Sequence, residues 1–191
     1  MEKFVKKIES LDNITQWSEV DSVVKETVSQ HSFKVAAIAN YLLQSIDLIN
    51  YENTLPQRFK ADVLSYAIMH DFDEAIFGRD VSHIVKYNNF NGEHIRNSIN
   101  EYVDHVMESE FPEINIAVES HVKRFVKLCD WLALLTFVNR NQRMGCKTFE
   151  AEDVYCRENI LKTMTEVEDI LAEKFDVKVG SLFESIKLYA L

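Results

Sequence analysis

Glycine and proline are scarce in this chain: four glycines and two prolines occur among its 191 residues. A fold of strands joined by tight turns needs more of them, because these residues supply the backbone angles of turns. Apolar residues recur instead at the three- and four-residue spacing of amphipathic helices. We therefore expect an all-α fold with a single domain over residues 1–191, a length that suits one hydrophobic core.

The apolar spacing also predicts where the helices lie. The expected helices cover residues 2–11, 31–48, 54–76, 92–109, 116–141, 150–175 and 180–189. Thr27 or Ser29 is the expected N-cap of the second helix, because either side chain can accept a hydrogen bond from a backbone N–H group at the helix start. Residues 77–91 are expected to form a loop beside the functional site, with Gly78 as a helix breaker and a short helical patch over 83–88.

The chain is acidic, with a formal net charge of -10. This charge argues against binding nucleic acid or anionic membranes, because both need a basic face. The N-terminus has no apolar stretch of signal-peptide length, and no segment approaches the length of a membrane span. The three cysteines are odd in number and lack CxxC spacing, so neither a disulfide framework nor a zinc knuckle is indicated. We expect a cytoplasmic protein.

Four polar residues fall at positions that the apolar spacing assigns to the interior. His31 lies on the apolar stripe of the 31–48 helix, and His70 on that of the next helix with Asp71 at its edge. Asp130 lies within the stripe of the 116–141 helix. A single histidine on such a face is usually an ordinary hydrogen-bonded core residue. A carboxylate there is rarer, because its burial is costly without a cation or several donors.

One shared divalent ion would satisfy all of these polar side chains together. Two neutral imidazoles and two carboxylates form a mixed nitrogen and oxygen site, which suits Mn, Co, Fe, Ni or Zn. Such a site leaves coordination positions for water and a substrate oxygen. Glu74 is one helical turn from both His70 and Asp71, so its carboxylate is well placed to act on that water or on a leaving group.

The order of these residues, a His, then a His-Asp pair, then an Asp, resembles the HD-domain superfamily of metal-dependent phosphohydrolases. Three stretches resemble more narrowly the HD-domain 5'-deoxynucleotidases: QWSEVDSVVKETVSQHSFKVAAIANYLL, AIMHDFDEAIFGRDVSHIVKYNN and FVKLCDWLALL. Those proteins typically carry a Trp upstream of an EHS-type motif, an HDxxE motif, a G-D-x-P-x-P-V-K-Y-like loop and a V-K-x-A-D motif. The resemblance extends from about residue 14 to about residue 138. It implies a helical bundle with the metal site between its helices.

The resemblance also implies an activity and roles for individual residues. The activity is removal of the 5'-phosphate from deoxyribonucleoside monophosphates with one divalent metal, such as Co or Mn. Glu74 would be a catalytic carboxylate, and Asp80 would match a loop Asp that helps to activate water or to protonate the leaving nucleoside. Trp17 would match a Trp that packs near the sugar and disfavours the ribo form. The metal ligands would be His31, His70, Asp71 and Asp130.

Three departures from the family pattern leave the substrate open. Gln16 replaces an Arg that would grip the phosphate, and a neutral amide cannot make the charge-assisted fork of a guanidinium. The loop reads GRD rather than GD, so Asp80 is displaced by one residue and Arg79 is an additional cation. Arg79 either replaces the missing charge or faces solvent. Gln30 replaces the acid of the EHS motif.

Two lysines are further candidates for phosphate binding. Lys86 lies in the VKYNN stretch, and Lys127 lies one turn before Asp130 on the same side of its helix. A solvated surface position is the commoner alternative for any single lysine. With Gln16, Trp17 and Arg79, these lysines make up the expected substrate-binding set.

Two other functions stay open on the sequence. A deoxynucleoside triphosphohydrolase that releases tripolyphosphate would account for the lost Arg and for the added Arg79. A degenerate HD domain that senses nucleotides without turnover is the other, although Glu74 and all four predicted metal ligands are retained. Beyond these two functions, a helical interaction protein with a satisfied polar core and no bound transition metal is a further alternative. The expected partner is a small nucleotide, and the broad apolar helical faces are compatible with a homodimer.

Overall fold

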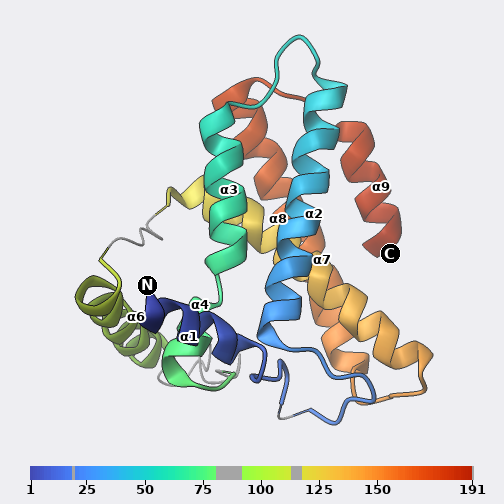
Figure 1. The fold of residues 1–191 in the computed structure, drawn as a ribbon. Coiled ribbons are helices and arrows are strands. Elements are labelled where there is room, and N and C mark those ends of the chain that lie inside the picture. The colour runs from blue at the N-terminus through green and yellow to red at the C-terminus, as the bar shows by residue number, and fades with distance from the viewer. Residues whose placement is uncertain (19, 81–91, 113–117, 191) are drawn as a thin grey trace.

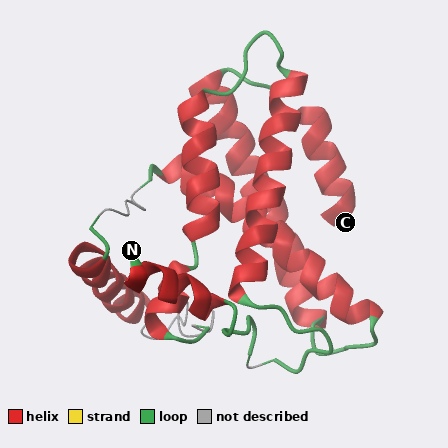
Figure 2. Cartoon of the chain, viewed as in Figure 1, coloured by secondary structure: helices red, strands yellow, loops and turns green. Residues whose placement is uncertain are grey.

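A computed structural model of the chain describes residues 1–18, 20–80, 92–112 and 118–190, with the backbone alone over 92–96. Helices joined by loops and turns make up the described residues, with one isolated antiparallel bridge between Thr15 and Thr27, and Figure 2 shows no strand among them. The all-α prediction is confirmed. The helices are α1 (Glu2–Leu11), α2 (Val28–Ile49), α3 (Gln57–Met69), α4 (Phe72–Phe77), α6 (Gly92–Glu110), α7 (Ser120–Arg143), α8 (Glu150–Phe175) and α9 (Gly180–Ala190).

Two clusters of buried apolar side chains hold these helices together. The larger cluster joins α2, α3, α7, α8 and α9, and the smaller one joins α1, α4, α6 and the first residue of α2. Figure 1 shows α1, α4 and α6 side by side near one end of the bundle that the other helices form. None of the described helices is long and apolar enough to cross a membrane.

The start of α2 is fixed by a reciprocal pair of hydrogen bonds. Thr27 Oγ1 accepts a hydrogen bond from the Gln30 backbone N–H (3.3 Å), and Gln30 Oε1 accepts one from the Thr27 backbone N–H (3.1 Å). This arrangement is a capping box, which a Gln closes as a Glu does. Of the two predicted N-caps the structure therefore selects Thr27. The change from the family's acid to Gln30 preserves the turn that carries His31.

The prediction of one continuous helix over 54–76 is wrong. The chain breaks at His70 and Asp71, where α3 ends and α4 begins, and the Asp71 backbone (φ -108°, ψ 23°) is not helical. The apolar spacing continues through the break for a physical reason. Ala67 packs into the larger cluster and Phe72 into the smaller one, so the pattern does not reveal that two different cores are being filled.

The remaining boundaries differ from the predicted ones by a few residues. Gly78 adopts a left-handed conformation (φ +70°) and ends α4, as its position in the sequence predicts. The helix expected over 116–141 begins at Ser120 and continues to Arg143. The expected helical patch over 83–88, which contains Lys86, lies outside the described residues.

Candidate metal centre and active site

Three of the four predicted metal ligands, His31, His70 and Asp71, lie where the two apolar clusters adjoin, and Asp130 contacts them from α7. On α2, Val28 belongs to the smaller cluster and Val35 to the larger one, and His31 lies between them. His70 and Asp71 likewise lie between the clusters along the chain, because Ala67 of α3 belongs to the larger one and Phe72 of α4 to the smaller one. Polar side chains at this boundary interrupt neither core, which explains how helices with apolar stripes accommodate them.

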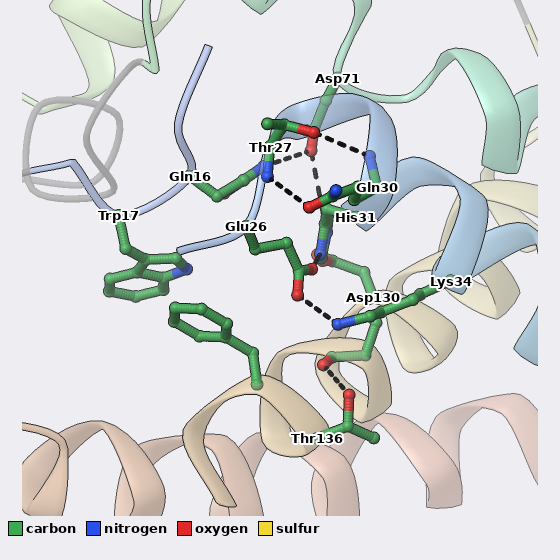
Figure 3. A network of polar contacts seen from close by, with 12 residues as sticks. Gln16, Trp17, Glu26, Thr27, Gln30, His31, Lys34, Asp71, Asp130 and Thr136 are labelled. Carbon is green, nitrogen blue, oxygen red and sulfur yellow. Dashed lines mark hydrogen bonds and ion pairs between the residues drawn. The ribbon is translucent and has the colours of Figure 1, made fainter. Parts of the chain in front are cut away.

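Ligand atoms from three segments converge at this boundary. His31 Nε2 lies 2.9 Å from Asp130 Oδ1 and 3.8 Å from Asp71 Oδ2, and His70 Nε2 lies 3.3 Å from the same Asp71 oxygen. Atoms of His31, His70 and Asp71 that can bind a metal all lie within 4.8 Å of one another. Figure 3 shows His31 between Asp71 and Asp130. The break before α4 places Asp71 beside His70, whereas neighbours in a continuous helix diverge by about 100°.

The His70 ring has the hydrogen bonding of a metal ligand. Its Nδ1–H donates to the Ala67 carbonyl (2.8 Å), so the lone pair of the neutral ring lies on Nε2. This Nε2 atom is buried and lies 3.3 Å from Asp71 Oδ2, but it makes no well-aligned hydrogen bond to any residue that the structure describes. A buried polar atom without an aligned hydrogen bond is costly, and a cation bound between Nε2 and the carboxylate would satisfy both. The residues at the site thus fit a divalent transition metal.

Sequence reasoning missed one buried acid at the site. Glu26 is 5% exposed, and its Oε1 lies 3.5 Å from His31 Nδ1, on the side of the ring opposite Asp130. Its other oxygen accepts a hydrogen bond from Lys34, as Figure 3 shows. Glu26 belongs to the irregular stretch before α2, where no helical period marks a residue as buried. Only its position five residues before His31 could have drawn attention to it.

Opposite charges at the site shift the pKa values of its members. Burial lowers the pKa of His31, but the hydrogen bonds to Asp130 and Glu26 outweigh burial and raise the pKa to about 10. Burial raises the pKa of Asp130, but the Lys127 charge and the His31 hydrogen bond hold it well below its usual range. The pKa of Asp71 is likewise lowered, because the charges of the nearby His70 and His31 outweigh burial.

These shifts predict how the stability of the metal-free protein depends on pH. The pKa of His31 is raised from 6.5 to about 10, so its contribution is complete below pH 6.5 and is lost as the pH rises through about 10. The lowered pKa values of Asp71 and Asp130 act at the acid end, where stability is lost as the pH falls below 3.8. We expect the free energy of unfolding of chelator-treated protein, measured in urea, to fall from pH 6.5 to about 10. His31→Gln should flatten this decline, and an equal decline in both proteins would contradict the assignment.

Two predicted phosphate-binding residues contact the predicted metal ligands. Gln16 Nε2 donates to Asp71 Oδ2 (3.1 Å), and Figure 3 shows the Gln16 side chain extending toward Asp71. Lys127 Nζ donates to Asp130 Oδ2 (2.7 Å) and lies 4.4 Å from the centre of the Trp131 ring. Both side chains therefore border the site, and their binding of phosphate stays a prediction.

Asp80 and Trp17 contact each other. The backbone N–H of Trp17 donates to Asp80 Oδ2 (2.6 Å), and that of Ser18 lies 3.4 Å from the same oxygen. Trp17 has a left-handed backbone (φ 56°), which is uncommon for a bulky residue and costs free energy. Asp80 thus stabilises the turn that carries Trp17, and its predicted part in proton transfer stays a prediction. Arg79 is exposed.

Glu74 lies at the edge of the predicted metal site. Its side chain is almost fully buried in α4, and carboxylate oxygens of Asp71, Asp73 and Glu74 lie within 4.8 Å of one another. The first turn of α4 continues directly from Asp71, because the Glu74 backbone N–H donates to the Asp71 carbonyl (3.1 Å). A carboxylate so close to a metal ligand can reach a reacting group held at the metal.

Solved structures with the same fold come from several organisms. The PH0347 protein of Pyrococcus horikoshii is 18% identical, with a TM-score of 0.67 over 100% of this chain and 98% of its own. An HD-domain phosphohydrolase of Listeria innocua is 16% identical, with a TM-score of 0.66 over 98% of both chains. A conserved hypothetical protein of Pyrococcus furiosus is 18% identical, with a TM-score of 0.62 over 100% of this chain and 98% of its own. At these identities the likeness concerns the fold.

Sequence comparison supplies the family. No curated protein matches the chain significantly. A family model described as 5'-deoxynucleotidase YfbR-like matches residues 3–176, which is most of the chain. This match supports a metal-dependent phosphohydrolase, the activity class that the His and Asp pattern predicts. The chain belongs to the YfbR-like 5'-deoxynucleotidase family.

Proposed function

We propose that this protein removes the 5'-phosphate from deoxyribonucleoside monophosphates, with one divalent metal held by His31, His70, Asp71 and Asp130. The observation that carries the proposal is the convergence of these side chains, with a buried His70 Nε2 that makes no well-aligned hydrogen bond to any described residue. Membership of the 5'-deoxynucleotidase family supports the choice of substrate.

The residues around the site have distinct tasks in this proposal. A divalent ion, when bound, lowers the pKa of water and polarises a phosphoryl oxygen. Glu74 orients the attacking water or gives a proton to the leaving 5'-oxygen. Lys127 and Gln16, which contact Asp130 and Asp71 respectively, offer N–H donors to the phosphate. Trp17 packs near the sugar.

The identity of the metal follows from the donor set. Two imidazoles and two carboxylates favour a first-row transition metal over Mg, which prefers a shell of oxygen ligands. We propose Mn or Co, with Fe, Ni and Zn as the other metals of this class. A reducing, cytoplasmic environment is also proposed, since all three cysteines are free thiols.

A hydrolysis screen tests the proposed function. Purified protein is treated with a chelator, reloaded with Mn, Co, Mg or Zn, and given deoxy- and ribonucleoside mono-, di- and triphosphates. We expect loss of activity on chelation, recovery with Mn or Co, and release of orthophosphate from deoxyribonucleoside monophosphates in preference to the ribo forms. Metal and nucleotide binding without any hydrolysis would instead indicate a nucleotide sensor.

A triphosphohydrolase is the second candidate, because of one observation on the residues expected to bind phosphate. Gln16 occupies the position of the family's Arg and donates to Asp71, so it supplies no positive charge for a monophosphate. Arg79 is an exposed cation two residues after the end of α4. A longer, more highly charged phosphate chain could reach it. Tripolyphosphate as the product from a deoxynucleoside triphosphate would favour this candidate.

A further inference from the structure

We infer that Glu26 is a positioning residue for the metal site: it accepts the Nδ1–H of His31 and thereby directs the lone pair of Nε2 at the ion. The inference rests on the metal-binding part of the proposed function and is independent of the nucleotide substrate. Glu26 itself does not join the ligand set, because it lies on the far side of the imidazole from Asp71 and Asp130.

The two ring nitrogens of His31 face different sets of carboxylates. Nε2 faces Asp130 at 2.9 Å and Asp71 at 3.8 Å, whereas Nδ1 faces Glu26 at 3.5 Å. Carboxylates accept hydrogen bonds and donate none, so both ring nitrogens face acceptors in this structure. An ion bound at Nε2 would replace the proton on that atom, and the remaining proton would lie on Nδ1, where Glu26 accepts it. Ligating histidines are commonly oriented by a carboxylate at the other ring nitrogen in this way.

His70 is oriented by a different acceptor, and the comparison isolates the role of Glu26. The Nδ1–H of His70 donates to the Ala67 carbonyl, a backbone group of its own helix. His31 Nδ1 faces the Glu26 carboxylate instead, although α2 begins at Val28 and also has a carbonyl three residues before this histidine. Unlike a backbone carbonyl, the side chain of Glu26 adds a negative charge, which strengthens the imidazole as a ligand.

Glu26 is itself held from two directions. Lys34, one turn after His31 on α2, donates to its second carboxylate oxygen and compensates the buried charge. The Glu26 carbonyl accepts a hydrogen bond from the Gln16 backbone N–H (2.8 Å), while the Gln16 side chain donates to Asp71. Glu26 therefore ties the irregular segment that carries Gln16 and the first turn of α2 to one arrangement of the predicted ligands.

Metal affinity in two Glu26 variants tests the inference. Glu26→Ala removes the acceptor, and its dissociation constant for Mn²⁺, measured by titration calorimetry, should rise about 10- to 100-fold. Glu26→Gln keeps an oxygen that can accept from Nδ1–H but loses the ion pair with Lys34, so it should retain more of the affinity than the alanine variant. Lys34→Met removes the ion pair alone and should weaken Mn²⁺ binding least.

Asp47→Asn is the matched control for Glu26→Gln, because it also neutralises an acid that is paired with a lysine. Asp47 Oδ2 lies 2.6 Å from Lys60 Nζ at the opposite end of the helix from His31, and this variant should bind Mn²⁺ like the wild type. Wild-type affinity in Glu26→Ala would overturn the inference. Equal losses in Glu26→Ala, Glu26→Gln and Lys34→Met would overturn it too, because they would assign the effect to the ion pair.

A second measurement needs no variant. In wild-type protein loaded with Zn²⁺, the ring nitrogens of His31 should show the pattern of a neutral imidazole with its proton on Nδ1 in long-range ¹H–¹⁵N spectra. A proton on Nε2 would overturn the inference. If the wild type binds neither Mn²⁺ nor Zn²⁺, the proposed metal site fails as well, whereas normal wild-type binding with an unaffected Glu26→Ala variant removes only the role of Glu26.

Discussion

An Asp130→Asn variant is expected to stay folded and to lose its metal-dependent turnover. Asp130 accepts hydrogen bonds from His31 Nε2 (2.9 Å) and Lys127 Nζ (2.7 Å), so its carboxylate supplies an oxygen ligand and offsets the cations around it. The amide of Asn is a weaker ligand and carries no charge. The loss in kcat/KM should exceed the roughly 10- to 100-fold loss typical of residues that only orient a ligand. Turnover is measured with Mn²⁺, and the Mn²⁺ dissociation constant by calorimetry.

Asp153→Asn is the matched control for this variant. Asp153 is buried to a similar degree (side-chain exposure 20%, against 17% for Asp130) and pairs with a cation of its own helix, Arg157, at 3.0 Å. Its loss should lower the unfolding temperature slightly and leave kcat/KM unchanged. Full turnover with wild-type metal affinity in Asp130→Asn would show that Asp130 is not a ligand.

The approach of the predicted metal ligands on regular helices could be expected from the sequence alone. His31 and Asp130 lie on helices whose buried faces follow the helical period, and their side chains meet at 2.9 Å. The apolar spacing brings Asp71 near them for an incomplete reason. A continuous helix would set it at the edge of the stripe, whereas the break before α4 turns its carboxylate toward His70 and His31.

The parts of the site built by irregular segments could not be predicted in this way. Glu26 and the Trp17 turn belong to the stretch before α2, where burial depends on contacts with residues distant in the sequence. The Trp17 backbone meets Asp80 across 63 positions, and the Gln16 side chain meets Asp71 across 55. Contacts between residues so far apart in the sequence leave no periodic pattern of apolar residues from which they could be predicted. The same limit applies to the two apolar clusters, because spacing shows that a face is buried and not which core it fills.

Glu74→Gln is expected to lower kcat by roughly 10²- to 10⁴-fold, the contribution of a positioned acid or base, while the metal stays bound. Glu74 is 2% exposed, and its carboxylate lies within 4.8 Å of that of Asp71. The Gln side chain has nearly the same shape, so it keeps the packing of α4 but can neither take up nor release a proton. The measurement is kcat at saturating nucleotide and Mn²⁺, with the Mn²⁺ dissociation constant determined on the same samples.

Saturation with metal separates the catalytic role of Glu74 from that of a ligand. A side chain that only binds the ion affects how much metal is bound, so excess Mn²⁺ would restore kcat to the wild-type value. A side chain that moves a proton affects the reaction of the loaded protein, and no concentration of Mn²⁺ restores it. Recovery of full kcat in excess Mn²⁺ would therefore show that Glu74 acts as a metal ligand and not in proton transfer. Persistent loss at wild-type metal affinity would leave proton transfer, or the orientation of the attacking water, as the task of this carboxylate.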